Sequence, residues 1–305
     1  MKSIIILSLA FLCTDQAQSA DFKYGTLVKK IAFGAVQDHK GDTSHWKAVN
    51  TELPNIWVWL GEITETTFAG PKAKKKAYDK VLATLGYQEL RARSQILGVW
   101  DEEDARPSRK KNSAPFLEFI GEAFDSPRFM RNALYASYLI GPAGKQIKLI
   151  LLDTFTQRKK GKDLLGSQQW EWLEKELADE VDKPSVILIG SPLPYLGDGD
   201  RNRAWRDYSG EQLKLMNLLS KINTPTYILS GHNRYGEFSQ VELANGLKLV
   251  EVSSSGLNKT ANKSKDNAFR IGSPVLGRNF GILEFQWPSS ENSEPLKTTY
   301  RIQNL

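Results

Sequence analysis

The stretch Thr226-Tyr-Ile-Leu-Ser-Gly-His-Asn-Arg-Tyr-Gly-Glu237 joins a short apolar run to a polar loop through a Ser-Gly pair. Two earlier stretches are built alike: Ile56-Trp-Val-Trp-Leu-Gly-Glu62 ends in a glutamate, and Ile96-Leu-Gly-Val-Trp-Asp-Glu-Glu-Asp104 ends in an acidic cluster. Each short apolar run that stops at a turn predicts a buried strand followed by a loop. Because ligand sites of α/β proteins lie at the carboxyl ends of strands, the three loops are predicted to converge on one pocket.

Apolar runs alternate with helical patterns along the rest of the chain. Strands are predicted over 30–33, 56–60, 94–100, 134–140, 147–153, 186–190, 226–230, 248–252 and 280–286. Helices are predicted over 44–52, 73–85, 114–124, 167–179 and 210–222. Early β–α alternation followed by closely spaced strands indicates an α/β protein with mixed sheets. No Pro/Gly/Ser-rich linker divides the chain, so residues 22–305 are predicted to form one domain.

Residues 1–20 have the pattern of a secretory signal peptide: Lys2, an apolar run over 4–12, and small residues up to Ala20. Cleavage is expected after Ser19 or after Ala20. Cys13 is the only cysteine, so the mature chain would have none, which excludes disulfides, thiolate catalysis and cysteine metal ligands. No later stretch approaches the ~18 apolar residues of a membrane span. The mature protein is therefore predicted to be exported and soluble, either secreted or periplasmic.

The net charge of +6 is concentrated in basic runs at 72–76, 109–111 and 158–162. Solvated surfaces explain these runs, and attraction to anionic surfaces or phosphorylated ligands is the alternative. No run shows the aromatic interleaving of a nucleic-acid groove. The chain also has no P-loop, no dinucleotide fingerprint and no Gly-x-Ser-x-Gly elbow.

Six segments in one order resemble the alkaline phosphatase D family, the PhoD-like phosphatases, over most of the chain after residue 30. The segments are 30–36, 57–62, 99–104, 164–173, 229–237 and 252–257. The resemblance implies the four-layer metallophosphatase sandwich, in which two mixed β-sheets are flanked by helices. It also implies a metal site on loops at the ends of the central strands and the hydrolysis of phosphoric esters.

The positions that carry metal chemistry in the family are altered in this chain. Family members read F-G-S-C, L-G-D, W-D-D-H-D and S-G-D-x-H, where this chain reads Phe33-Gly-Ala-Val36, Leu60-Gly-Glu62, Trp100-Asp-Glu-Glu-Asp104 and Ser230-Gly-His-Asn-Arg234. Val36 has no donor atom, and the guanidinium of Arg234 stays protonated, so neither can coordinate a metal. Glu62 can still bridge two cations, but Glu103 stands at a family histidine and would repel a phosphate. A centre of two cations about 3.5–4 Å apart is therefore hard to build here.

These departures predict a pseudoenzyme without a cofactor, in which Arg234 neutralises Glu62, Glu102 and Glu103. Such a protein would bind an anionic or phosphorylated ligand, or a partner, through Asn233, Arg234 and Trp205. No catalytic residue is assigned, since Glu103 and Arg234 are the degenerate positions, and the sequence specifies no oligomeric state.

The alternative is an active phosphomonoesterase or phosphodiesterase with a remodelled site. Asp38, Glu62, Glu102 and His232 would then hold a divalent cation, Mg²⁺, Mn²⁺ or Ca²⁺. The direction of the Arg234 side chain distinguishes the two hypotheses. Arg234 should point into the carboxylates in the first and turn away from a convergent Glu62, Glu102 and His232 in the second.

Overall fold

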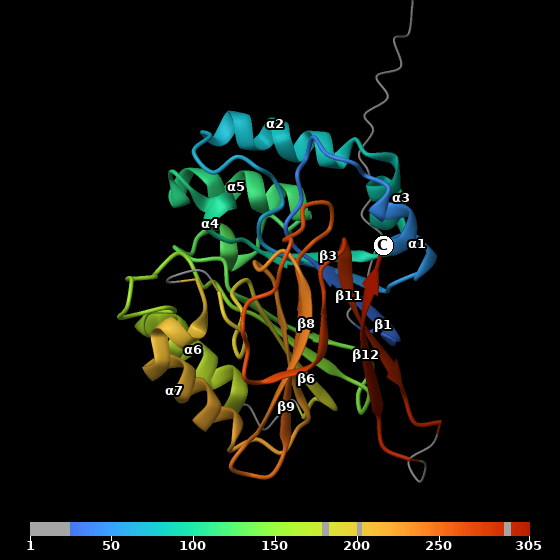
Figure 1. The fold of residues 1–305 in the computed structure, drawn as a ribbon, viewed down its shortest axis with the longest axis vertical. Coiled ribbons are helices and arrows are strands. Elements are labelled where there is room, and N and C mark those ends of the chain that lie inside the picture. Colours follow the sequence, from blue (N-terminus) through green and yellow to red (C-terminus); the bar gives the residue numbers. More distant parts are fainter. Residues whose placement is uncertain (1–24, 179–182, 200–202, 290–293) are drawn as a thin grey trace, which may run out of the picture.

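The computed structural model describes residues 25–178, 183–199, 203–289 and 294–305, and the predicted signal peptide lies outside these ranges. Two mixed β-sheets pack against each other, and helices cover their outer faces (Figure 1). The predicted four-layer α/β architecture is confirmed. No helix in the described ranges is long and apolar enough to cross a membrane.

The first sheet has the strand order β12-β11-β1-β2-β3. Its strands are β1 (Lys30–Gly34), β2 (Ile56–Leu60), β3 (Gln95–Val99), β11 (Asn279–Gln286) and β12 (Lys297–Asn304). β1, β2 and β3 are parallel, whereas β11 pairs antiparallel with both β1 and β12. β2 is apolar throughout because both of its faces are covered.

The second sheet has the order β10-β8-β9-β7-β6-β5-β4. Its strands are β4 (Ala136–Ile140), β5 (Ile147–Leu151), β6 (Val186–Ser191), β7 (Thr226–Ser230), β8 (Gly236–Glu242), β9 (Lys248–Ser254) and β10 (Arg270–Val275). The central strands β5, β6, β7 and β9 are parallel, and antiparallel strands flank them on both sides.

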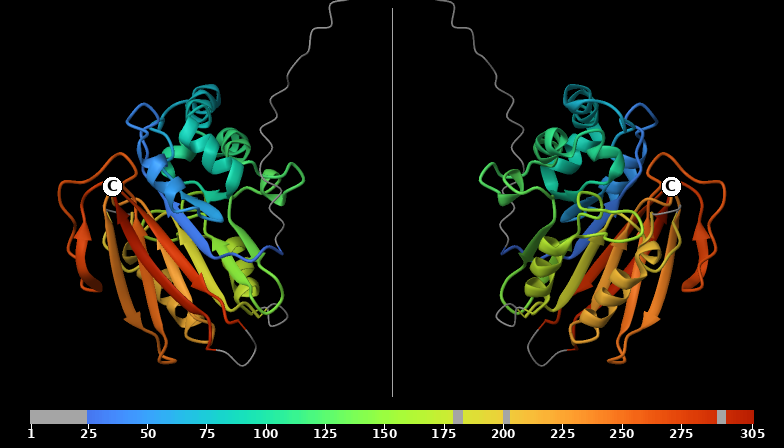
Figure 2. Two further views of the ribbon diagram at one scale, coloured as in Figure 1. Left: turned by 90° about the vertical axis from the view of Figure 1, so that its right-hand side faces the viewer. Right: turned by 90° about the vertical axis from the view of Figure 1, so that its left-hand side faces the viewer.

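The helices form two groups on opposite sides of the molecule (Figure 2). They are α1 (His45–Thr51), α2 (Pro71–Leu82), α3 (Leu85–Arg93), α4 (Glu102–Ala105), α5 (Arg109–Ile120), α6 (Ser167–Ala178) and α7 (Ser209–Leu219), with 3-10 turns at Pro127–Phe129 and Trp205–Tyr208. α1, α2, α3 and α5 lie beside the first sheet, and α6 and α7 beside the second.

Two apolar cores hold the layers together. The larger joins the two sheets and the first helix group, with Leu60 of β2 and Leu229 of β7 in one cluster. The smaller joins the second sheet to α6 and α7 through residues such as Ile189 and Trp170. Burying each of these large side chains stabilises the fold by roughly 1.5–3 kcal/mol, so the loops that follow the strands rest on a rigid frame.

Several elements differ from the sequence expectations. The strands β8, β10 and β12 and the helix α3 were not predicted, because their residues are largely polar or only half-buried and carry no long apolar run. The helix expected over 114–124 is wrong in its bounds: α5 starts at Arg109 and ends before Gly121, whose φ of +76° closes the helix.

A pH prediction follows from His45, which begins α1 and is 1% exposed. Burial, followed by the charge of Arg278, lowers the pKa of its imidazole to about 4. As the pH falls below about 6.5, the unfolded chain takes up this proton first, so the folded state loses stability. We expect the free energy of unfolding to fall by on the order of 2 kcal/mol from this group between pH 6.5 and 4.

Urea denaturation of the wild type and His45→Gln at pH 7 and pH 4.5 measures this contribution. The variant lacks the titrating ring, so its stability should depend less steeply on pH. Equal pH dependence of the two proteins would contradict the assignment.

Candidate functional site

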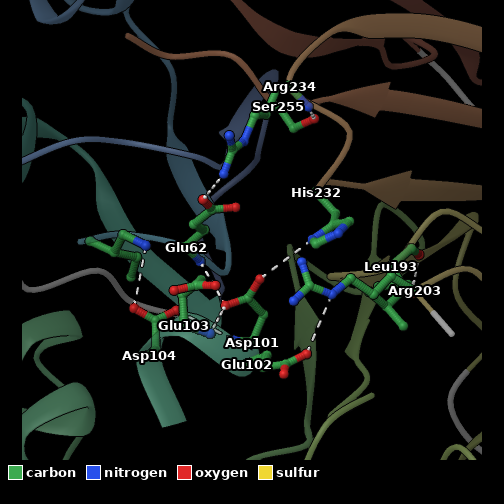
Figure 3. Close-up of polar contacts among 12 residues, drawn as sticks. Glu62, Asp101, Glu102, Glu103, Asp104, Leu193, Arg203, His232, Arg234 and Ser255 are labelled. Carbon is green, nitrogen blue, oxygen red and sulfur yellow. Dashed lines mark hydrogen bonds and ion pairs between the residues drawn. The ribbon is translucent and has the colours of Figure 1, made fainter. Parts of the chain in front are cut away.

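The loops that follow β2, β3 and β7 meet where Glu62, Asp101 and His232 lie together (Figure 3). The loop after β1 joins them, since the amide of Gln37 donates to the carbonyl oxygen of Glu62 at 2.8 Å. Two glycines permit their contact. A Cβ atom on Gly61 would lie 2.6 Å from the Cβ of Asp101, and one on Gly231 would lie 2.8 Å from the carbonyl oxygen of Leu60. Because real Cβ atoms do not approach so closely, larger residues at these two positions would push the loops apart.

The same loops carry a concentration of left-handed backbone. Val36, Glu62, His232 and Arg234 have positive φ values of 61°, 49°, 74° and 64°. This region is uncommon for residues other than glycine and is an outlier for a β-branched residue such as Val36. Such strain costs of order 1–3 kcal/mol per residue and gathers at functional sites. The loops therefore have the strained backbone that is typical of functional sites.

Three side chains from three of these loops form the described group best suited to a metal ion. One ligand atom each from Glu62, Asp101 and His232 lies within 4.8 Å of the others, and all three residues are buried. The Nδ1 atom of His232 is 3.8 Å from Asp101 Oδ2, beyond hydrogen-bonding distance, and is buried without a partner. An orphaned imidazole nitrogen beside two carboxylates suits a single divalent cation.

Asp101 is held in place as the N-cap of α4. Its Oδ1 atom accepts hydrogen bonds from the backbone amides of Glu103, at 2.9 Å, and Glu62, at 3.2 Å. Asp104 completes a capping box by accepting from the amide of Asp101. Burial acts to raise the pKa of Asp101, but the His232 ring and these amides outweigh it and keep the pKa below its usual value.

The pKa of Glu62 is shifted in the opposite direction from the pKa of Asp101. Burial and the charge of Asp101 raise the pKa of Glu62 to about 8, and Arg234 only partly offsets this. Nη2 of Arg234 lies 3.0 Å from Glu62 Oε1, while 42% of the Arg234 side chain stays exposed. Arg234 therefore points into the carboxylates and remains accessible from solvent (Figure 3).

Glu102 and Glu103 do not join the three-residue group. Glu102 forms ion pairs with Arg106 and Arg158, and Nε of Arg203 lies 3.6 Å away. Glu103 is half-buried, and its pKa is raised by burial and then by Asp101. Lys74 donates to the carbonyl oxygen of Glu103 at 2.6 Å. The acidic loop is thus surrounded by fixed positive charge.

The other predicted site residues lie apart from the group. The Asp38 carboxylate accepts from the amide of Lys40. Asn233 is buried and donates to the carbonyl oxygen of Asp198 at 2.8 Å. Trp205 is fully buried, and its indole donates to Ser191 Oγ at 2.9 Å. Of the three residues predicted to bind a ligand, Arg234 alone offers its side chain to solvent.

Asp101 was not predicted as a ligand, whereas its neighbour Glu102 was. The signal that could have identified it is the Asp-x-x-Asp spacing of Asp101 and Asp104 after an apolar run, which is typical of a helix cap. A capping carboxylate at the end of a strand is anchored in the site, whereas the next residue enters the helix and turns away.

Comparison with known proteins places the fold. No protein-family model matches the sequence, and no curated protein matches it significantly. Among solved structures, PhoD superposes with a TM-score of 0.67 at 14% identity, over 90% of this chain and 69% of that one. A dimetal phosphatase from Danio rerio gives 0.57 at 16% identity, over 90% and 98%. GAP50, the anchor in the inner membrane complex of Plasmodium, gives 0.58 at 15% identity, over 89% and 88%.

These superpositions cover nearly all of the described chain, so it has the PhoD-like metallophosphatase fold. The resemblance found in the sequence motifs is confirmed at the level of the fold. Identities of 14–16% carry no activity over to this chain. The chemistry has to be argued from the residues at the loop ends.

Proposed function

We propose that this protein is an exported pseudoenzyme on the PhoD-like metallophosphatase scaffold, which binds an anionic ligand or partner and hydrolyses nothing. The observation that carries the proposal is the ion pair between Arg234 and Glu62. It puts a guanidinium against a carboxylate at two positions that match metal ligands in the family motifs. A guanidinium has no lone pair for a metal, and it satisfies the carboxylate in a cation's place.

The charges around the site support the same conclusion. The carboxylates of the site are Glu62, Asp101, Glu102, Glu103 and Asp104, and the cationic groups that contact them or lower their pKa are Lys74, Arg106, Arg158, Arg203 and Arg234. Five cationic groups thus surround five carboxyl groups, and burial raises the pKa of two of these, Glu62 and Asp104, to about 8 and about 7. A site neutralised by its own side chains has less need of a bound cation.

The donor set does not fit the two-cation centre. Glu62, Asp101 and His232 supply three ligand atoms, and Val36 and Arg234 supply none. Two cations held about 3.5–4 Å apart need more ligands than this. The similar fold of GAP50, an anchor by its description, is consistent with a scaffold that serves binding.

The alternative function is a metal-dependent phosphoric ester hydrolase with one cation. The unpartnered Nδ1 of His232, beside Asp101 and Glu62, is the observation in its favour. These residues would hold the cation, which would supply Lewis-acid chemistry to a bound ester. Arg234 opposes this by repelling a cation from Glu62.

Replacing Arg234 by a metal ligand tests the proposal. Arg234→His removes the charge beside Glu62 and adds an imidazole, so we expect Mn²⁺ or Zn²⁺ to bind at least about tenfold more tightly than to the wild type, a gain of about 1.4 kcal/mol. Calorimetric titration at pH 7.5 measures the affinity and the stoichiometry. Arg206→His is the matched control, because Arg206 is an exposed arginine that pairs with Asp198, outside the site.

The proposal fails if the wild type already binds two cations per chain and Arg234→His gives no gain in affinity.

Export has a separate test. Secreted protein should begin at Ala20 or Asp21, and a mature form that retains Met1 would exclude the signal peptide.

A further inference from the structure

A polar hollow, separate from the cluster around Glu62, lies between α5 and the segment 129–134, which follows α5 along the chain. Its volume is about 560 Å³, within the range of small-molecule sites. The hollow shares no residue with the cluster around Glu62, although Trp100 in its wall is the residue before Asp101 in the sequence. Any ligand held here would therefore contact different side chains from those around Arg234.

The hollow is lined by positive charge alone. Arg109, Lys110 and Arg131 contribute three cationic side chains, and no carboxylate lines it. Three other hollows of the described chain, beside α1, beside β4 and at the ends of α6 and α7, each include at least one glutamate. The nearest carboxylate is that of the buried Asp153, which accepts hydrogen bonds from Trp100, Leu134 and Thr156 in the wall. Three cations against this one carboxylate leave a positive potential that attracts anions.

These cations are oriented but not neutralised. Arg109 donates to the carbonyl oxygen of Thr156 and lies 5.3 Å from the ring centre of Phe155. Arg131 stacks 4.2 Å from the ring centre of Tyr135 and donates to its carbonyl oxygen. Within the described ranges, neither arginine nor Lys110 forms an ion pair, so their charge is available to a ligand.

The position of the charges on α5 also favours a bound anion. Arg109 and Lys110 occupy the first turn of a twelve-residue helix that has no acidic residue there. Cations at this end oppose the helix dipole. An anion in the hollow would relieve this repulsion. The hydroxyl groups of Ser113 and Thr156 in the lining already donate to the carbonyl oxygen of Lys110 and to the carboxylate of Asp153, so the cationic side chains are the groups that would hold the anion.

The lining also includes large apolar side chains. Phe129 and Met130 belong to it, and Met130 is 92% exposed. The segment that carries them, green in Figure 2, stands out from the body of the molecule. An exposed methionine beside a cationic pocket fits a ligand with an anionic head and an apolar group.

We propose that the hollow between α5 and residues 129–134 binds the phosphate head of an amphipathic phosphomonoester. The cationic side chains hold the phosphate, and Phe129 and Met130 cover the apolar group. This site goes beyond the proposed function, because it does not depend on Arg234 or on the state of the metal loops.

Calorimetric titration with phenylphosphonate, which cannot be hydrolysed as an ester, tests the site at 0.15 M salt, where weak surface attraction is screened. Saturable binding by the wild type is expected, with weaker binding of methylphosphonate because it lacks the apolar ring. The double variant Arg109→Gln/Lys110→Gln should raise the Kd for phenylphosphonate at least tenfold. Arg131→Gln is the fallback if the double variant does not fold, and this single change should raise the Kd for phenylphosphonate several-fold.

The charge-matched control Lys248→Gln/Lys297→Gln changes two exposed lysines on β9 and β12 and should leave the Kd within twofold. Arg234→Gln is measured beside it, because a loss in that variant alone would place the phosphonate at the cluster around Glu62 instead. The site is refuted by an equal loss of affinity in the control, by a loss in Arg234→Gln alone, or by equal affinity for the two phosphonates.

A vesicle experiment distinguishes a lipid headgroup from a soluble ester as the ligand. It compares vesicles that contain phosphatidic acid with vesicles of phosphatidylcholine alone. Binding to these vesicles alone assigns a lipid headgroup, binding to phenylphosphonate assigns a soluble ester, and binding to neither refutes the site.

Discussion

Purified mature protein supplied with Mn²⁺, Ca²⁺, Fe³⁺ or Zn²⁺ is expected to hydrolyse nitrophenyl phosphate mono- and diesters no faster than a protein-free blank. In a two-metal hydrolase, the cations lower the pKa of a bound water towards about 7 and clamp the attacking and leaving oxygens. Here Val36 and Arg234 supply no ligand, and Glu102 is engaged by arginines. Glu103 adds negative charge beside the site, where the phosphate of a substrate would be repelled.

Elemental analysis after metal loading should accompany these assays. At most one weakly held cation per chain is expected, from Glu62, Asp101 and His232. Glu62→Ala is the informative variant, because an unchanged background rate shows that Glu62 supports no turnover. Two stoichiometric metals with robust turnover that Glu62→Ala abolishes would refute the pseudoenzyme proposal. That outcome would leave the phosphonate site next to α5 unaffected.

Glu251→Ala is expected to lower the free energy of unfolding by at least about 4 kcal/mol. Glu251 lies on β9, is fully buried, and accepts from the amides of Tyr195 and Leu196, both at 2.7 Å. It also accepts from the amide of Gly197 and from the hydroxyl of Ser230. Truncation would leave these buried donors without an acceptor, and each such loss costs about 1–3 kcal/mol.

Urea denaturation measures this change, and Glu242→Ala provides the matched control. Glu242 is an exposed glutamate on the neighbouring strand β8, so its truncation should change stability by less than about 0.5 kcal/mol. Hydrogen exchange at the amides of residues 195–197 should accelerate in Glu251→Ala alone. Equal stability of the two variants would show that Glu251 does not anchor this loop.

The predictability of the strands depended on their burial. Runs such as 56–60 and 186–190 were predicted because parallel strands covered on both faces are apolar throughout. The strand β12 lies at the edge of its sheet and has mostly half-buried residues, so no run of apolar residues marks it. The helix α3 has few buried positions and no acidic residue in its first turn, so its pattern is equally weak.

The candidate site was predictable in its loops and in two of its three members, Glu62 and His232. The loops after β2, β3 and β7 were expected to converge, and they do. Glu102 was expected in the site, but Asp101 lies there, because Asp101 caps α4 and Glu102 starts the helix. Trp205 was expected at the ligand, yet its indole is buried against Ser191. A sequence position does not reveal which way a side chain leaves its loop.

Residue chemistry was sufficient to predict that Val36 and Arg234 cannot hold a metal ion. A valine has no donor and an arginine no lone pair, and these properties hold in any conformation. The order of apolar runs and turns was likewise sufficient for the α/β architecture. Folding decided the rest, because it brings residues that lie far apart in the sequence within a few ångströms. The pairing of Arg234 with Glu62, 172 positions apart, and the hollow between α5 and residues 129–134 both arise in that way.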